Sequence, residues 1–272
     1  RYSPFDVVAD MEGLTNTRNA AGKNLFSKRY EMLKLLDSIN RKQSQYGSIL
    51  DEMHDFYTNA RRMMYEPKVN DAFQFSIEDR ERYGATGLGN SCIVARNLLK
   101  NDLGTRYIQI NSRGWDHHED IYLEDAGLYA RCAELDPALS NLLTDLVTTP
   151  GSTGNTLLDE TLIVVKGEFG RTIGNLTSRN GRDHYFVHFA LFAGGGIRGG
   201  QIIGKTTADG RFVQDPGWSI GRPATAEDIA ATIYSAMGIN YTTVRQDDPL
   251  GRGFPYVPST PWQAYPIDEL FK

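Results

Sequence analysis

The chain has 272 residues, of which 40% are hydrophobic and 23% are charged, a balance that is ordinary for a globular protein with a buried core. The formal net charge of -5 is spread over interspersed acidic and basic residues, which excludes an electrostatic case for nucleic-acid binding. No run of about 18 apolar residues occurs, so the sequence predicts no membrane-spanning helix. Arg1 is not methionine and no signal segment follows it, which indicates a processed or excerpted chain.

The first part of the chain, residues 1–104, is predicted to be a helical segment. Apolar residues recur at helical spacing within residues 32–39 and 50–57, and Gly47 separates these two runs, which favours an antiparallel helix pair. A further short helix is expected to start at Ser76, and another is expected over residues 91–100, before Gly104.

The second part, residues 105–272, alternates between strand-like and helical patterns. Residues 106–110 and 161–165 are β-rich runs, and the second is nearly all apolar and β-branched, as in a buried parallel strand. Runs at 186–192 and 201–203 predict further strands, and residues 121–147 predict a helix. Residues 225–228 form a capping box that begins another helix, which Gly238 ends. This alternation predicts an α/β core with a mostly parallel sheet flanked by helices, in one continuous domain with the helical segment.

Histidine and acidic residues gather in three short clusters. Residues 114–120 read Gly-Trp-Asp-His-His-Glu-Asp after the first predicted strand, residues 167–171 read Gly-Glu-Phe-Gly-Arg after the most apolar strand, and residues 181–185 read Gly-Arg-Asp-His-Tyr before another strand. Open α/β sheets bind ligands outside the carboxyl ends of their strands. We therefore expect the three clusters to meet at one edge of the sheet.

The residue types of these clusters suit a divalent cation. Carboxylates and imidazoles without thiolates favour zinc or manganese, and iron or calcium is possible. Several carboxylates can hold two cations, which clamp an in-line displacement at phosphorus or sulfur. Each cluster also has a structural interpretation: Asp116 and Asp183 as turn-capping residues and Glu168 as an ion-pair partner of Arg171.

Two other motifs give no support for a different chemistry. Residues 194–199 match the pattern G-x-G-x-x-G, but strand-like residues follow where a dinucleotide site requires a helix, so a glycine-rich turn is predicted. No nucleophile elbow is present, and the two cysteines, Cys92 and Cys132, are interpreted as buried free thiols.

In their order along the chain, the clusters resemble the domain of unknown function 1501 family, a bacterial sulfatase-like branch of the alkaline phosphatase superfamily. Its members carry Gly-Trp-Asp-x-His, a strand ending in Glu-Phe-Gly-Arg, Gly-Arg-Asp-His with an aromatic residue, and a glycine-rich turn. The corresponding segments here are residues 114–118, 168–171, 181–185 and 194–200, and residues 228–233 and 237–239 also fit.

This resemblance implies an alkaline phosphatase-like fold and a set of site residues. Family members usually have threonine where this chain has His117, so either neighbouring histidine could reach the metal ion. Arg171 is then the catalytic candidate, and Arg182 and His117 are candidates for substrate binding. The implied metal ligands are Asp116, His118, Glu168, Asp183 and His184.

The function implied by the resemblance is a metal-dependent hydrolase of small phosphate or sulfate esters. Family members are longer at the N-terminus, so only part of the active site is expected in this chain, and a second chain or an N-terminal fragment would complete the sheet. The alternative is a non-catalytic exported protein that keeps the fold for binding or assembly. Because family members commonly carry export signals, a periplasmic or extracellular location is expected.

Overall fold

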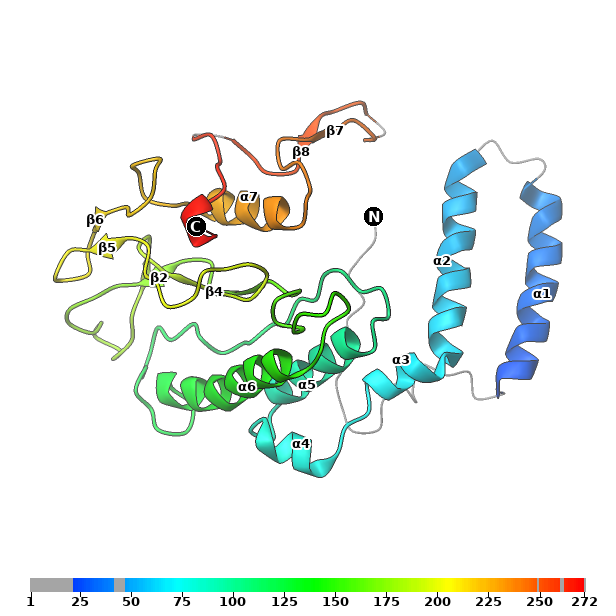
Figure 1. The fold of residues 1–272 in the computed structure, drawn as a ribbon, viewed down its shortest axis with the longest axis horizontal. Coiled ribbons are helices and arrows are strands. Elements are labelled where there is room, and N and C mark those ends of the chain that lie inside the picture. The colour runs from blue at the N-terminus through cyan, green and yellow to red at the C-terminus, as the bar shows by residue number, and fades with distance from the viewer. Residues whose placement is uncertain (1–21, 42–46, 249, 260–261, 272) are drawn as a thin grey trace. The chain divides into compact units, whose positions relative to one another are not determined.

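The computed structural model describes residues 22–41, 47–248, 250–259 and 262–271, so Arg1 and the processing argument that depends on it lie outside the described residues (Figure 1). Its chain forms two compact units, which are described separately. The first unit contains the described residues up to Ser112 together with Ala133–Asp145. The second unit contains Arg113–Cys132 and the described residues from Leu146 onwards.

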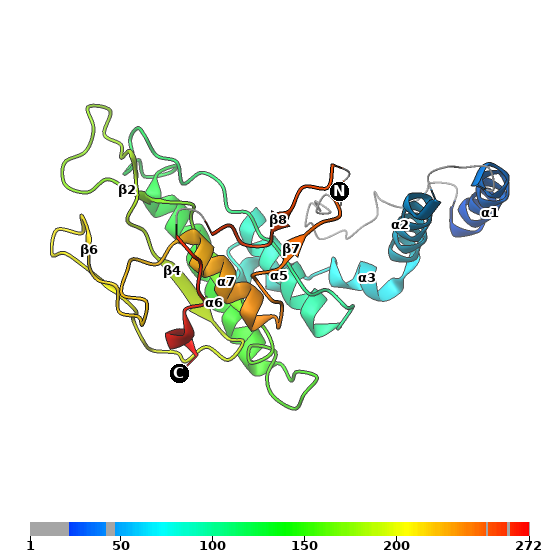
Figure 2. The ribbon, with the colours of Figure 1, turned by 90° about the horizontal axis from the view of Figure 1, so that it is seen from above.

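The first unit begins with the expected helix pair, α1 (Gly22–Arg41) and α2 (Gly47–Tyr65), which lie side by side in Figures 1 and 2. The Tyr30 hydroxyl lies 3.3 Å from the Thr58 hydroxyl, and Arg61 donates a hydrogen bond of 3.1 Å to Ser27. These contacts confirm an antiparallel arrangement of the two helices. The side chains of residues 39–52, which include part of each apolar run, lie outside the description.

Three helices follow: α3 (Pro67–Ala72), α4 (Ile77–Arg82) and α5 (Gly87–Lys100). Ser76 caps α4 as expected, because its hydroxyl accepts a hydrogen bond from the Asp79 amide at 3.1 Å. The helix predicted from residue 91 begins one turn earlier, where Thr86 supplies the cap. The apolar faces of α3 and α5 meet in a core of Ala72, Phe73 and Val94 with Val69, Phe75, Leu98 and Leu103 around it.

A polar network completes the first unit. Asp145 lies in the long helix α6 (Leu128–Thr148), whose middle part belongs to this unit. Its carboxylate accepts hydrogen bonds from Arg82, from Arg96 at 2.7 Å and from the Tyr83 hydroxyl at 2.8 Å. Burial alone would raise the pKa of Asp145, but these three donors outweigh it and lower the pKa to about 2.

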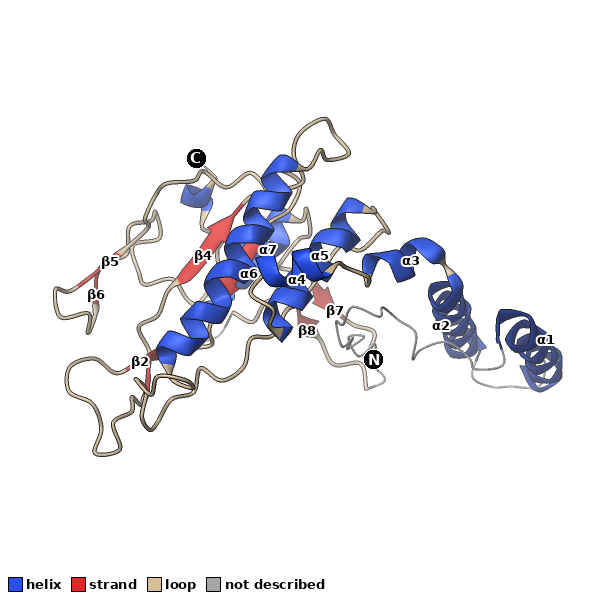
Figure 3. Ribbon diagram, turned by 90° about the horizontal axis from the view of Figure 1, so that it is seen from below, coloured by secondary structure: helices blue, strands red, loops and turns tan. Residues whose placement is uncertain are grey.

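The predicted parallel sheet is absent from the described residues, and the expected alkaline phosphatase-like α/β fold is wrong. Every sheet has two strands that run antiparallel, and Figure 3 shows how short the strands are. A second chain or an N-terminal fragment was expected to complete a parallel sheet, and the described residues contain no such sheet to complete. The pairs are β1 (Ile163–Lys166) with β4 (Ala190–Ala193), β2 (Gly170–Arg171) with β3 (His184–Tyr185), β5 (Lys205–Thr206) with β6 (Val213–Asp215), and β7 (Val244–Arg245) with β8 (Phe254–Pro255).

The connection between β1 and β4 explains their direction. A parallel pair needs a crossover, usually through a helix. Residues 167–189 contain no helix and fold back through the β2–β3 ladder, so β4 returns antiparallel to β1, with Ile163 opposite Ala193. The runs at 106–110 and 201–203 form no strands. The Gln201 side chain donates instead to the carbonyl of Glu269 at 2.9 Å, and Tyr107 is exposed.

The second unit is held together around α7 (Ala226–Ala236), where the predicted capping box of Thr225 and Asp228 is confirmed. Asp228 is fully buried and accepts two hydrogen bonds from Arg222 and one of 2.9 Å from the Tyr265 amide. A core formed by Trp218, Ile267 and Leu270 includes Phe192 of β4. The C-terminal segment, with its 3-10 helix η2 (Asp268–Leu270), is thereby fixed beside the strand that follows the site.

Three smaller expectations can be compared directly with the structure. Residues 194–196 form a bend and turn, and residues 197–204 contain no helix, so the predicted glycine-rich turn is confirmed. Both cysteines are free; Cys92 is buried, with its thiol pKa raised by burial to about 11, whereas Cys132 is only partly buried. Among the described helices, none combines the length and the hydropathy that crossing a bilayer requires.

Candidate metal centre

Backbone pairing brings two of the three clusters together within the second unit. The segment around His118 runs beside residues 179–182: the Arg182 amide donates to the His117 carbonyl at 2.9 Å, and the Ile121 amide donates to the Asn180 carbonyl at 3.0 Å. The sequence carries no strong β pattern here, because both segments are polar. The pairing nevertheless places His118 next to the residues that follow Arg182.

Gly181 makes this close approach possible. A Cβ atom at this position would overlap the backbone carbonyl of His118 and the amide of Glu119. The absence of a side chain is therefore a packing requirement, since any other residue would push the two segments apart. The glycine that precedes the Arg-Asp-His sequence thus sets the distance between the first cluster and the third.

The β2–β3 ladder brings the remaining cluster to the same place. Arg171 is the register partner of His184, so the strand that carries the arginine lies directly beside the strand that carries the histidine. Thr172 extends the pairing: its amide donates to the Asp183 carbonyl at 2.9 Å, and its hydroxyl accepts from the Asp183 amide at 3.1 Å. Thr172 was not predicted as a site residue, and its residue type alone gives no signal for this role.

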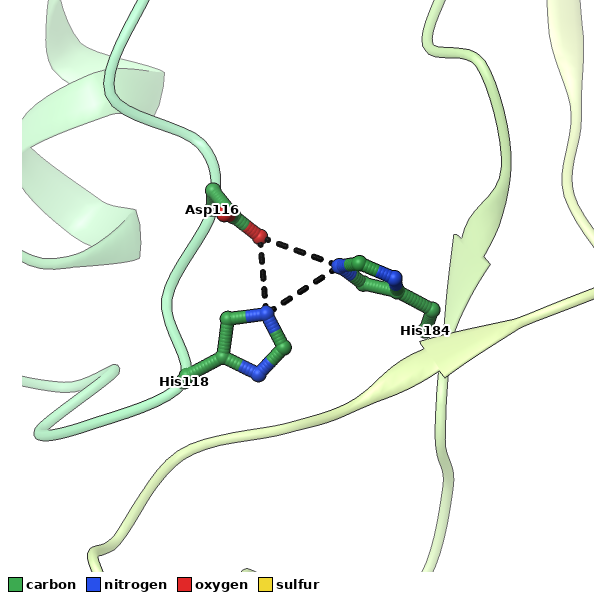
Figure 4. A group of neighbouring side chains, drawn as sticks. All are labelled: Asp116, His118 and His184. Atoms are coloured by element: carbon green, nitrogen blue, oxygen red, sulfur yellow. Dashed lines mark hydrogen bonds and ion pairs between the residues drawn. The ribbon is translucent and has the colours of Figure 1, made fainter.

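Asp116, His118 and His184 point toward one another, as Figure 4 shows. Asp116 Oδ1 lies 3.1 Å from His118 Nε2 and 3.4 Å from His184 Nε2, and the two Nε2 atoms lie 3.1 Å apart. We call these three residues the donor triad. Asp116 and His118 come from a loop and His184 from β3. The triad is open to solvent, with side-chain exposures of 69%, 32% and 52% respectively.

The separations of the triad atoms fit a divalent cation. Zinc binds carboxylate oxygen and imidazole nitrogen at about 2.0–2.2 Å, so neighbouring ligands in a tetrahedral site lie about 3.3–3.6 Å apart. The three observed separations of 3.1, 3.1 and 3.4 Å are within a few tenths of an ångström of these values. One oxygen and two nitrogens also form a donor set that suits zinc or manganese.

Two further residues make contact with the triad. Asp183 Oδ1 lies 3.1 Å from His118 Nδ1, on the opposite side of the ring from the triad. Arg171 Nη2 donates to Asp116 Oδ1, and this hydrogen bond is the largest cause of the lowered pKa of Asp116. The aromatic ring of Phe169 lies against His184, with ring centroids 4.1 Å apart, and was not predicted as a site residue although it belongs to the recognised Glu-Phe-Gly-Arg sequence.

Three of the residues expected in the site do not belong to the donor triad. Glu168 is exposed and does not join the donor triad. The Arg182 guanidinium donates to the carbonyl of Thr172, the residue after β2, at 2.6 Å. His117 has a buried Nε2 atom without a hydrogen-bond partner among the described residues. Burial, together with the charges of Arg131 and Arg171, lowers the pKa of His117.

Comparison with models of protein families identifies the family of this chain. The model of the family described as "Protein of unknown function (DUF1501)" matches residues 2–260. The chain belongs to this family. No curated protein and no solved structure matches the chain significantly. All three clusters fall within the matched residues, so the expected membership of the DUF1501 family is confirmed, whereas the relation of this family to sulfatases stays a prediction.

Proposed function

We propose that this DUF1501 chain is a metal-dependent hydrolase of phosphate or sulfate esters, with the divalent cation held by Asp116, His118 and His184. The observation that carries the proposal is the convergence of three metal-ligating atoms, separated by 3.1–3.4 Å, from segments up to 68 residues apart. Such a set of one carboxylate and two imidazoles is used by hydrolytic metal sites.

The openness of the triad favours catalysis over a structural role for the metal. Structural zinc sites are closed by four protein ligands, whereas catalytic sites keep a position for water or substrate. The donor triad supplies three ligands, and its side chains are 32–69% exposed. This favours the enzyme over the alternative of a non-catalytic binding or assembly protein.

Each part of the site has a role in the proposed reaction. A divalent cation supplies Lewis-acid catalysis and lowers the pKa of water near it. Arg171, which contacts the triad through Asp116, would neutralise an anionic ester group. Asp183 would hold the His118 ring, so that Nε2 keeps its lone pair toward the triad. No side chain is assigned as the nucleophile.

The class of reaction is supported by the site motifs and not by the fold. The order Gly-Trp-Asp-x-His, Glu-Phe-Gly-Arg and Gly-Arg-Asp-His is the resemblance from which we infer ester hydrolysis. A periplasmic or extracellular location, expected from the export signals of family members, stays a prediction that cell fractionation tests. Recovery of the protein from the cytosol alone would contradict it.

The test combines metal analysis with activity. Purified protein is analysed for zinc, manganese, iron and calcium, and hydrolysis of p-nitrophenyl phosphate and p-nitrophenyl sulfate is measured before and after chelation. We expect a bound transition metal, hydrolysis of one of these esters, and loss of both when His184→Ala is introduced. Metal content without hydrolysis of any ester tested would favour the binding or assembly role.

The control variant is His188→Ala. His188 is also a histidine close to β3, but its Nδ1 atom contacts the Phe186 carbonyl at 3.2 Å and it does not belong to the triad. The metal content of this variant should equal that of the unaltered protein. Equal metal content in His184→Ala would reject the proposed site.

A further inference from the structure

We infer that the guanidinium of Arg171 competes with the metal ion for the carboxylate of Asp116. When the metal ion is bound, the same guanidinium binds an anion. The inference rests on the proposed metal site and adds a coupling between metal and anion. It makes two statements about Arg171. The arginine weakens metal binding in the absence of an anion, and it strengthens metal binding in the presence of one.

The competition follows from the contacts of one oxygen atom. Oδ1 of Asp116 accepts the hydrogen bond from Arg171 Nη2, and the same atom is the one that faces both imidazoles. A guanidinium and a metal ion that meet at this oxygen repel each other. At about 4 Å, this repulsion is large enough to weaken the binding of a dication by about tenfold, even with the screening of water.

Arg171 is held beside the triad by contacts that do not involve Asp116. Its Nη1 donates to the Arg182 carbonyl at 3.1 Å, and its guanidinium carbon lies 5.8 Å from the centroid of the Phe169 ring. The side chain is 22% exposed, so it has little freedom to move into solvent. When a metal ion takes the Asp116 oxygen, the charged donor therefore stays close to the triad and needs another acceptor.

A tetrahedral oxyanion supplies that acceptor. The planar guanidinium presents several N–H donors, which match the oxygens of a phosphate or sulfate group. The anion is then attracted by the metal ion and by an arginine whose carboxylate partner is engaged elsewhere. Because coupling between two ligands is reciprocal, an anion should raise the metal affinity as much as the metal ion raises the anion affinity.

The experiment measures zinc affinity by titration calorimetry, with and without sodium sulfate, which leaves zinc soluble. The unaltered protein is compared with Arg171→Gln, which removes the charge but keeps a polar side chain. Arg179→Gln is the matched control, since Arg179 carries the same charge in the loop before β3 but pairs with Glu119 instead of the triad. Thermal melts by circular dichroism verify that each variant is folded.

Without sulfate, we expect Arg171→Gln to bind zinc about tenfold more tightly than the unaltered protein, and Arg179→Gln to bind it equally. Sulfate should tighten zinc binding by the unaltered protein and should have a much smaller effect on Arg171→Gln, in which only the metal ion attracts the anion. Equal or weaker zinc binding by Arg171→Gln would show that the arginine only positions Asp116, and would overturn the inference while leaving the metal site.

The sulfate effect on the unaltered protein needs no variant, so the inference can be tested even if Arg171→Gln does not fold. Unchanged zinc affinity in sulfate would overturn the coupling. Failure of the unaltered protein to bind zinc, manganese or iron would reject the donor triad itself, and the inference with it. The failure of the inference and the failure of the proposed function therefore give different results.

Discussion

Asp183 Oδ1 lies 3.1 Å from Nδ1 of His118, while Nε2 of the same ring lies 3.1 Å from Asp116 Oδ1. The imidazole is therefore held between a carboxylate on one side and the donor triad on the other. A carboxylate in this position fixes the tautomer and the orientation of a metal-binding histidine. The sequence suggested Asp183 as a metal ligand, whereas in the structure it lies outside the donor triad and contacts Nδ1 of His118.

Replacing Asp183 by alanine should lower zinc affinity by about 10- to 100-fold without unfolding the protein, since the ligand atoms remain but His118 loses its fixed orientation. Glu168→Ala is the control, because Glu168 is exposed and outside the triad. Calorimetric titration with zinc measures both variants. An equal loss of zinc affinity in both variants would support the assignment of Glu168 as a ligand that was made from the sequence.

Gly181→Ala tests the close backbone approach that assembles the site. The added Cβ would overlap the His118 carbonyl, so the two segments must separate, at an expected cost of about 1–3 kcal/mol in the free energy of unfolding. Zinc affinity should fall at the same time, since His118 moves away from His184. Gly199→Ala is the matched control, because nothing lies within 4 Å of a Cβ at Gly199. Urea unfolding measures the free energy of unfolding, and calorimetric titration measures zinc affinity. If neither quantity changes in Gly181→Ala, the proposed role of this glycine is contradicted.

The stability of the first unit should depend on Asp145 at acid pH. The pKa of this carboxyl is about 2 in the folded chain, against an ordinary value of 3.8. A lowered pKa means that its stabilising effect is fully present above pH 4 to 5 and is lost as the pH falls toward 2. Its contribution near neutral pH is about 2 kcal/mol.

Asp145→Asn removes this titrating group and isolates its effect. The difference in unfolding free energy between the unaltered protein and Asp145→Asn should be largest above pH 5 and should shrink between pH 4 and pH 2. Urea unfolding followed by circular dichroism at several pH values measures it. A difference that stays constant over this range would mean that the hydrogen bonds from Arg82, Arg96 and Tyr83 do not lower the pKa of Asp145.

In the second unit, Asp228→Ala should be strongly destabilising. Asp228 is fully buried, and its removal leaves Arg222 without the two hydrogen bonds that neutralise its charge. Breaking one half of a buried pair costs about 3–5 kcal/mol. The control is Asp247→Ala, which breaks an exposed pair with Arg245 and should change little. Similar unfolding curves for both variants would contradict the structural importance of the Asp228 network.

Much of the local structure was predictable because it depends on neighbouring residues. Ser76 and the capping box of Thr225 and Asp228 mark helix starts, since a cap is formed within one turn of the chain. The apolar run at 161–165 predicted a strand where β1 lies, for the same reason. The sequence also identified the three clusters, because histidine, carboxylate and arginine residues seldom gather in short polar segments without a role.

Direction and partnership of the strands were decided by the tertiary structure. An apolar run such as 161–165 shows a preference for extended backbone and for burial, but it does not specify which strand it pairs with or in which direction. The helix-free connection between β1 and β4 decided that they pair antiparallel. Residues 106–110 are also β-rich but form no strand, because no segment that the structure describes pairs with their backbone.

The selection among the candidate site residues was also tertiary. The sequence offered Asp116, His118, Glu168, Asp183 and His184 as candidate ligands, since residue type, cluster membership and family resemblance are all that it provides. Backbone pairing across Gly181 and the register of Arg171 with His184 brought three of them into one triad. The chain alone therefore determined which groups could bind a metal ion, and the distances set by folding decided which of them can share one, because coordination depends on separations of a few ångströms.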